Sequence, residues 1–147
     1  MSANEDDLAA FRDNFRLDEL KVDESDGWVL SVRPGQLTLA SMVVSASGGE
    51  QWFNDLATGQ DSGFFAMVAS AERLAKQVYG AVRLNVVALM MKDPVVHFHV
   101  LPRYDSVVER YGRAWSDEDW PGPPTFGTAA TDDAVLHAIR DDLRAAL

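Results

Sequence analysis

Two pairs of strand-like runs, each joined by a very short break, constrain the fold of this chain most strongly. The first pair is GWVLSV (27–32) and QLTLASMVVSA (36–46), which the tripeptide RPG separates. The second pair is RLNVVALMM (83–91) and VVHFHVLPRY (95–104), which KDP separates. Parallel neighbours need long crossover connections, so runs this close in sequence predict antiparallel pairs.

Two longer segments have the spacing of amphipathic helices. In DSGFFAMVASAERLAKQVYG (61–80) apolar residues recur every three or four positions, and Gly80 can end the helix. DDAVLHAIRDDLRAAL (132–147) has the same periodicity. The order strand, strand, helix, strand, strand, helix predicts an α+β fold with the helices on one side of an antiparallel sheet.

The length of the chain predicts one domain over residues 1–147, because 147 residues can bury a sizeable core. Residues 1–14 are acidic with a few apolar positions, and we expect a loose or mobile helix there. Residues 115–147 are expected to form an irregular aromatic segment, WSDEDWPGPPTFG, followed by the last helix.

Composition excludes several classes of partner and site. The net charge of −10 disfavours nucleic acid polymers, whose binding requires neutralisation of phosphates, although one or two arginines can still bind a small phosphate ligand. With no cysteine, the chain has neither disulfides nor thiolate ligands. The longest apolar runs, such as VVALMM, are too short to cross a bilayer, and the acidic start does not resemble a secretory signal. We therefore expect a cytoplasmic protein without membrane association.

Two of the three histidines, His97 and His99, lie one residue apart in the last strand-like run. Side chains two apart on a strand point to the same face, so both imidazoles share a face with Val95 and Leu101. The opposite face, residues 96, 98 and 100, is wholly apolar and is the natural core face. The histidine face is therefore expected to be the more open one.

Three interpretations of this pair follow from its chemistry. The two side chains can be solvated strand histidines with no function. They can be two ligands of a metal ion, although a metal site needs further ligands and only His137 remains. They can also act on phosphorus, one as a neutral imidazole nucleophile and the other as a donor to a phosphate oxygen.

The surrounding sequence favours the third interpretation. RLNVVALMMKDPVVHFHVLPRY resembles the histidine triad (HIT) superfamily, whose signature alternates three histidines with apolar residues on a strand. It is similar to a bacterial branch with LN…ALMM, a DP turn, VHFHV and PRY. The likeness extends to WVLSVRPGQLTLASMVV upstream and WPGPP downstream, and covers about residues 15–125.

This resemblance implies a HIT-like α+β domain with a five-stranded antiparallel sheet and two main helices, commonly assembled as a homodimer. It implies a small-molecule nucleotide as ligand, with no cofactor and no metal. By position His97 would be the nucleophile that attacks the α-phosphorus, His99 would assist at the phosphate, and Asn85 would contact the phosphate region.

The sequence also departs from the family pattern. Val95 occupies the position of the first triad histidine, although a backbone carbonyl can do part of the orienting work of that residue. The additional upstream histidine would fall near Ser47–Gly48, where none is present. The turn that is rich in glycine, glutamine and serine in many members is here MMKDP.

Five further residues are candidates for binding a nucleotide or its phosphates. Each also has an ordinary structural interpretation, as a turn residue or as a solvated charge at the end of a strand. Arg103 should share the histidine face by alternation, provided that Pro102 does not bend the strand. The five candidates are Arg33, Gln36, Lys92, Asp93 and Arg103.

The sequence thus predicts a nucleotide hydrolase or nucleotidyl transferase that works through a covalent nucleotidyl-histidine. Its substrate would be a nucleoside phosphoramidate, a dinucleoside polyphosphate or a nucleotide conjugate. The first alternative is a nucleotide-binding protein of the same fold with little or no catalysis. The second alternative is a protein that binds metal through His97 and His99.

Overall fold

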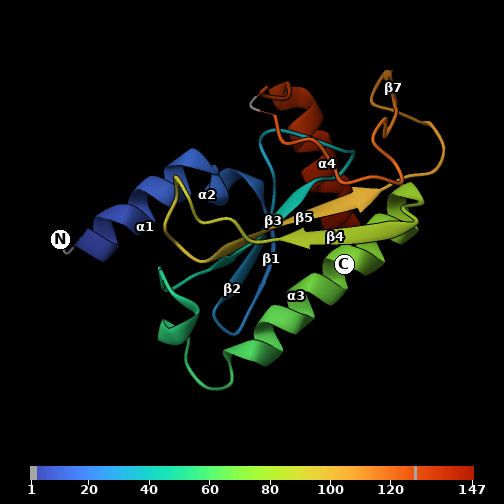
Figure 1. Ribbon diagram of the computed structural model, residues 1–147. Coiled ribbons are helices and arrows are strands. Elements are labelled where there is room, and N and C mark those ends of the chain that lie inside the picture. The colour runs from blue at the N-terminus through green and yellow to red at the C-terminus, as the bar shows by residue number, and fades with distance from the viewer. Residues whose placement is uncertain (1–2, 128) are drawn as a thin grey trace.

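A computed structural model describes residues 3–127 and 129–147 (Figure 1). Four α-helices, seven strands, a short 3₁₀ helix and a π-helical turn follow one another in the described residues. In chain order they are α1 (Ala3–Asn14), α2 (Leu17–Leu20), β1 (Lys21–Ser25), β2 (Trp28–Val32), β3 (Met42–Ala46), the 3₁₀ helix (Phe53–Asp55), α3 (Gln60–Leu74), the π turn (Ala75–Tyr79), β4 (Arg83–Val87), β5 (His97–Arg103), β6 (Val108–Arg110), β7 (Arg113–Trp115) and α4 (Asp133–Ala145).

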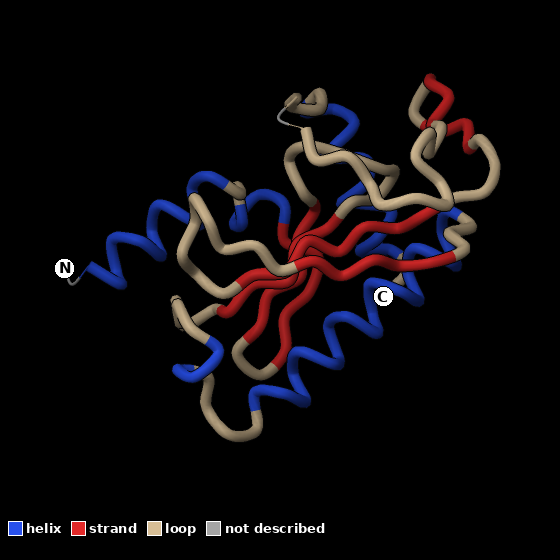
Figure 2. Tube along the Cα trace, in the orientation of Figure 1, coloured by secondary structure: helices blue, strands red, loops and turns tan. Residues whose placement is uncertain are grey.

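Five strands form one antiparallel sheet in the order β1-β2-β3-β5-β4 (Figure 2). The predicted α+β fold and both predicted antiparallel pairs, β2 with β3 and β4 with β5, are confirmed. In the centre of the sheet β3 pairs with β5, so that Val43 lies opposite His99 and Ser45 opposite His97. Both histidines therefore lie on a strand with hydrogen-bonded neighbours on each side.

The first predicted strand pair is joined by a longer connection than expected, because residues 36–41 do not extend. Gln36 accepts a hydrogen bond from the backbone N–H of Ser41 and donates to two backbone carbonyls. The Ser41 hydroxyl donates to the carbonyl of Thr38. Local side-chain bonds of this kind compete with strand pairing, so β3 begins at Met42.

Three strands were not predicted from their own residues. β1 is an edge strand with the polar sequence KVDES, and edge strands do not need an apolar pattern. Strands β6 and β7 form a separate hairpin around Tyr111 and Gly112, both of which have positive φ. Each of these strands is too short or too polar for periodicity to reveal it.

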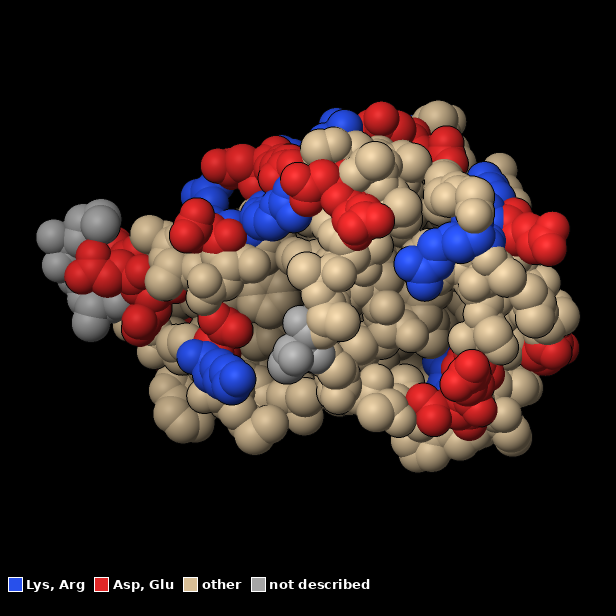
Figure 3. Space-filling view, turned by 90° about the horizontal axis from the view of Figure 1, so that it is seen from above, with Lys and Arg blue, Asp and Glu red and all other residues tan. Residues whose placement is uncertain are grey.

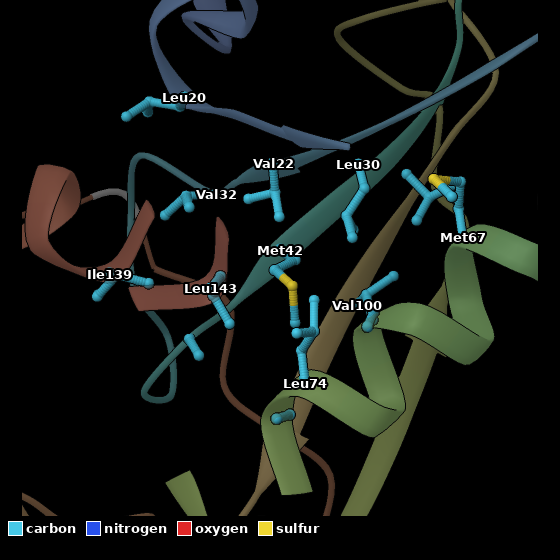
Figure 4. Close-up of a cluster of buried hydrophobic side chains, with 14 of the residues drawn as sticks. Leu20, Val22, Leu30, Val32, Met42, Met67, Leu74, Val100, Ile139 and Leu143 are labelled. Carbon is cyan, nitrogen blue, oxygen red and sulfur yellow. The ribbon is translucent and has the colours of Figure 1, made fainter. Parts of the chain in front are cut away.

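The two predicted helices pack on the same face of the sheet. α3 continues through the π turn and ends at Gly80, whose φ of 77° suits glycine. α4 turns its apolar side towards β1 and β2. In Figure 4 side chains of both helices meet side chains of β2, β3 and β5, among them Leu30, Met42 and Val100.

The opposite face of the sheet is also covered, which corrects the expectation that the histidine face is open. The predicted loose segment is a docked helix from residue 3, and Phe11 at its inner side is 1% exposed. Residues 1–2 lie outside the described part. Phe11 forms a second, smaller core with Leu17, Val43 and Val95. The histidine strand is therefore buried on both faces.

Among the described residues, no helix is both long enough and apolar enough to cross a membrane.

Leu30→Ala should destabilise the protein by about 2–5 kcal/mol, because Leu30 is completely buried and its truncation leaves a cavity in the core. Phe65→Ala is the matched control, since Phe65 is 73% exposed on α3 and its loss should change stability by less than about 0.5 kcal/mol. Urea unfolding of both variants measures the difference. Equal effects would contradict this description of the core.

Candidate active site

A pocket of about 670 Å³ opens beside the two strand histidines. Its walls come from β5, the β4–β5 loop, the end of α1, the turn after β2, and residues 126, 127, 129 and 130. Figure 1 shows the β4–β5 loop, in yellow, beside α1 and α2. A cavity of this size is in the range that holds a small organic ligand.

A backbone contact fixes the ring of His97 in one tautomer. Its Nδ1 lies 2.7 Å from the carbonyl oxygen of Val95. A carbonyl can only accept, so Nδ1 carries the proton and Nε2 keeps its lone pair. Among the described residues Nε2 has no hydrogen-bond partner, and the ring lines the pocket.

The ring of His99 has the opposite arrangement. The Nε of Arg33 donates to His99 Nδ1 at 3.3 Å. A guanidinium can only donate, so Nδ1 is unprotonated and the proton of the neutral ring is on Nε2. The two rings, whose centroids are 5.1 Å apart, therefore offer one nucleophilic nitrogen and one N–H donor.

Aromatic rings pack around the pair. Phe11 and Phe15 lie 5.1 Å and 5.4 Å from His97 between ring centroids, and Phe126 lies 5.4 Å from His99. His97 is 3% exposed and His99 is 6% exposed. Packing against these rings limits the rotation of both imidazoles.

Burial shifts both histidines towards the neutral form. The pKa of His97 is lowered by burial, against the opposing effects of the Val95 hydrogen bond and Asp93. The pKa of His99 is lowered to about 4 by burial, by His97 and by Arg33. A neutral imidazole is the form that can act as a nucleophile, so both rings are in the reactive protonation state at neutral pH.

Three of the other residues predicted to bind phosphate lie at this pocket. Arg33 forms one wall and Lys92 and Asp93 form another. The Asp93 carboxylate accepts a hydrogen bond of 3.2 Å from the side chain of Asn14, which links the β4–β5 loop to the end of α1. The structure thus brings two cations and one carboxylate together beside the histidines.

Arg103 and Asn85 are engaged elsewhere, at the far end of β5. Arg103 is 2% exposed and donates to Asp117 at 2.7 Å and 3.1 Å, to Asn85 Oδ1 at 2.8 Å and to the Gly122 carbonyl at 2.8 Å. Neither Arg103 nor Asn85 lines the pocket. The phosphate role of both stays a prediction, and the structure uses their polar groups in a buried network away from the histidines.

Gln36 is likewise committed to structure, since its side chain holds the turn between β2 and β3. The two tryptophans of the aromatic segment do not line the pocket either. Trp115 is buried in the main core, and Trp120 lies against the Arg103 guanidinium at 5.6 Å. From the aromatic segment it is Phe126 that reaches the histidines.

Among the pocket residues that sequence reasoning missed are Asn14, Phe15 and Phe126. The four-residue spacing of Phe11 and Phe15 was a usable signal, because it marks one face of a helix that must cover something apolar. Neither Asn14 nor Phe126 has a local pattern that points to the pocket. Their positions depend on how distant segments meet.

Metal binding receives no support from the side chains around the pocket. In residues 3–127 and 129–147 no group of three histidine, aspartate or glutamate side chains is placed to hold a metal ion. The remaining histidine, His137, lies on α4 and contacts Glu19. The metal alternative therefore lacks the third ligand that it requires within the described residues.

The charge at the pocket differs in sign from the net charge of the chain. Seen from above, acidic and basic side chains lie in separate small groups with uncharged side chains between them (Figure 3). The chain carries a net charge of −10, whereas Arg33 and Lys92 outnumber Asp93 at the pocket. The pocket is therefore a locally favourable place for an anion.

Comparison with known proteins identifies the fold. No protein-family model matches the sequence, and no curated protein sequence matches it. A Hit-like protein involved in cell-cycle regulation from Bartonella henselae has a similar structure, with a TM-score of 0.69, 16% identity and coverage of 94% of this chain and 95% of that chain. A histidine triad protein from Sinorhizobium meliloti also has a TM-score of 0.69 at 16% identity, covering 90% and 93% of the two chains.

A third similar structure is a hypothetical histidine triad nucleotide-binding protein from Sulfolobus tokodaii. Its TM-score is 0.65 at 10% identity, and the match covers 95% of this chain and 89% of that chain. Identities this low establish shape and topology. The chain therefore has the histidine triad fold, and the predicted fold class is confirmed.

Arg103→Met should destabilise the protein by about 3–5 kcal/mol, because it leaves the buried Asp117 carboxylate without its partner. Arg83→Met is the matched control, since Arg83 is the exposed cross-strand neighbour of Arg103 on β4. Chemical unfolding of both variants measures the effect. An Arg103 variant of unchanged stability that lost only nucleotide affinity would support the phosphate role.

Stability should fall as the pH is lowered from 7 towards 4. His99 has a lower pKa in the folded chain, about 4, than the ordinary value of 6.5, so the unfolded chain binds the proton first. Its contribution is complete above pH 6.5 and is lost progressively below it, on the order of 3 kcal/mol in total.

Melting temperatures of wild type and His99→Asn at pH 7.5, 6 and 5 test this pH dependence. The variant should show the shallower decline. Parallel curves for wild type and His99→Asn would show that His99 is not the titrating group.

Proposed function

We propose that this protein is a nucleotide hydrolase or nucleotidyl transferase that acts at the α-phosphate through a covalent intermediate on His97. The observation that carries the proposal is the 2.7 Å bond from His97 Nδ1 to the Val95 carbonyl. This bond leaves Nε2 as an unprotonated nucleophile in a pocket large enough for a nucleotide.

The reaction has two displacements at one phosphorus atom. In the first, Nε2 of His97 forms a bond to the α-phosphorus, and the leaving group departs with the bonding electron pair and takes a proton from solvent. In the second, water or another hydroxyl acceptor attacks the same phosphorus. The phosphorus–nitrogen bond then breaks, its electron pair returns to Nε2, and the proton of the acceptor goes to solvent.

The neighbours of His97 have complementary tasks. The Nε2–H of His99 can donate to a non-bridging phosphate oxygen as negative charge develops there. Arg33 and Lys92 supply positive charge that attracts an anionic substrate to the pocket. The rings of Phe15 and Phe126 offer apolar surfaces for a base, and the histidine triad protein from Sulfolobus tokodaii is described as nucleotide-binding.

The replaced first histidine does not remove the nucleophile. The backbone carbonyl at that same position, Val95, holds Nδ1 of His97, so the tautomer does not depend on a histidine side chain there. The missing upstream histidine and the altered turn do remove other donors, and one oxyanion donor can contribute about 3–4 kcal/mol to a barrier. We therefore expect slow turnover, and a binding protein without turnover is the alternative that the experiment must separate.

His97→Asn should abolish formation of a nucleotidyl adduct and lower turnover at least about a thousandfold. The reason is that no other described residue presents an unprotonated imidazole nitrogen to the pocket. Wild type, His97→Asn and His137→Asn are mixed with adenosine phosphoramidate or a diadenosine polyphosphate and quenched without acid. Intact-protein mass spectrometry detects the added adenylyl mass, and chromatography detects released AMP.

The proposal predicts an adduct in wild type and in His137→Asn and none in His97→Asn. Wild type that forms no adduct and no product, but whose melting temperature rises with nucleotide, would overturn catalysis in favour of the binding protein. An adduct that persists in His97→Asn would assign the nucleophile to another residue.

A further inference from the structure

We infer that Arg33 is a positioning residue for the reaction: it holds His99 in the tautomer whose Nε2–H faces the substrate. This inference rests on the proposed function for its catalytic consequence, but the contact between the two side chains is independent of any substrate. It assigns to Arg33 a task that acts through another residue, beyond attraction of a phosphate.

The turn after β2 fixes the guanidinium in place. Arg33 is the first residue after β2, where its backbone N–H still bonds to the carbonyl of Ser41 at 2.9 Å. Its side chain then folds back over the following turn, and Nη1 donates to the carbonyl of Gly35 at 2.5 Å. Nε donates to His99 Nδ1, so two of its donors have defined partners from two different segments.

Gly35 makes this folded-back conformation possible. A Cβ atom at position 35 would lie 2.9 Å from Nη1 of Arg33 and 3.0 Å from the carbonyl oxygen of Ala129. Both distances are shorter than ordinary contacts, so a side chain there would displace the guanidinium. The absence of a side chain at Gly35 and the position of Arg33 therefore belong to one arrangement.

The Arg33 guanidinium is not paired with a carboxylate among the described residues. In residues 3–127 and 129–147 it forms no ion pair with an acidic side chain, and its own pKa is lowered by burial. Buried arginines normally have such a partner, as Arg103 has Asp117. The contacts of Arg33 are instead the His99 ring, the Gly35 carbonyl and the Phe126 ring, whose centroid is 6.0 Å from its Cζ.

A cation at Nδ1 has two effects on His99. As an obligatory donor it excludes the tautomer in which Nδ1 carries the proton, so the neutral ring must carry its proton on Nε2. As a positive charge it disfavours protonation of the whole ring. Loss of Arg33 would release both constraints, and part of the His99 population would then present a lone pair to the substrate in place of a donor.

The neighbours of the two histidines thus favour opposite tautomers. The Val95 carbonyl accepts from His97 and makes its Nε2 a nucleophile, whereas Arg33 donates to His99 and makes its Nε2 a donor. A free pair of imidazoles 5.1 Å apart could exchange these roles. Arg33 removes that ambiguity.

The direct test is the tautomer of His99, measured by two-dimensional NMR of the ring nitrogens in ¹⁵N-labelled protein without substrate. Wild type should show an unprotonated Nδ1 and a protonated Nε2. Arg33→Met keeps the aliphatic packing on Phe126 and removes the donor, and should show mixed tautomers and a raised pKa for His99. Arg73→Met on α3 removes the same charge from an exposed site and should leave both signals unchanged.

A double-mutant cycle tests the catalytic consequence with adenosine phosphoramidate as substrate. Arg33→Met should lower kcat by about tenfold to a hundredfold when His99 is present, the range found when a group that orients a metal-binding histidine is lost. In a His99→Asn background the same substitution should lower kcat by less than about threefold. Equal effects in the two backgrounds would show that Arg33 acts directly on substrate, which would overturn the inference.

The NMR result separates this inference from the proposed function. Wild-type tautomers in a folded Arg33→Met protein would overturn the positioning role even if the enzyme is active. Mixed tautomers in that variant would support the positioning contact even if no substrate is turned over, and only the proposed function would then fail. Should Arg33→Met not fold, Arg33→Ala provides the same comparison.

Discussion

The structure of the site depends on burial of β5 on both of its faces. One face packs Val96 and Val100 into the main core below α3 and α4, and the other carries His97 and His99 under the N-terminal helix. Polar groups on a strand in this position find most of their partners within the protein, because burial limits their access to water. Each imidazole has one such partner, a carbonyl for His97 and a guanidinium for His99. These two hydrogen bonds also define the chemistry that the rings can perform.

Burial and hydrogen bonding act together on protonation. Removal from water lowers the pKa of both histidines, so neither ring competes for a proton at neutral pH. Hydrogen bonds then decide which nitrogen of each neutral ring carries the remaining proton. The acceptor for His97 is a backbone carbonyl, so no polar side chain is needed at position 95. A valine there is therefore compatible with an oriented nucleophile.

The sequence was informative where a pattern extends over several residues. Alternation along the histidine strand, the periodic helices and the short breaks predicted the α+β class and the antiparallel pairs. β1 was missed because KVDES is polar, although the Asp26-Gly27 turn that joins it to β2 is a recognisable hairpin signal. The openness of the histidine face was misjudged because its cover, α1, is distant in the sequence. Contacts such as Asn14 with Asp93 depend on tertiary structure and have no local pattern.

Arg33 and Arg103 show why side-chain type alone could not define the site. Both are arginines at the ends of strands near the histidines, and both were equally good candidates for phosphate. Arg103 pairs with a buried carboxylate, so its charge is neutralised within the fold. Arg33 meets an imidazole and a carbonyl, neither of which neutralises its charge. A half-buried cation without a counterion is stable only at a pocket open to solvent or to an anion. The difference in partners therefore marks Arg33 as a residue of the site and Arg103 as a residue that stabilises the fold.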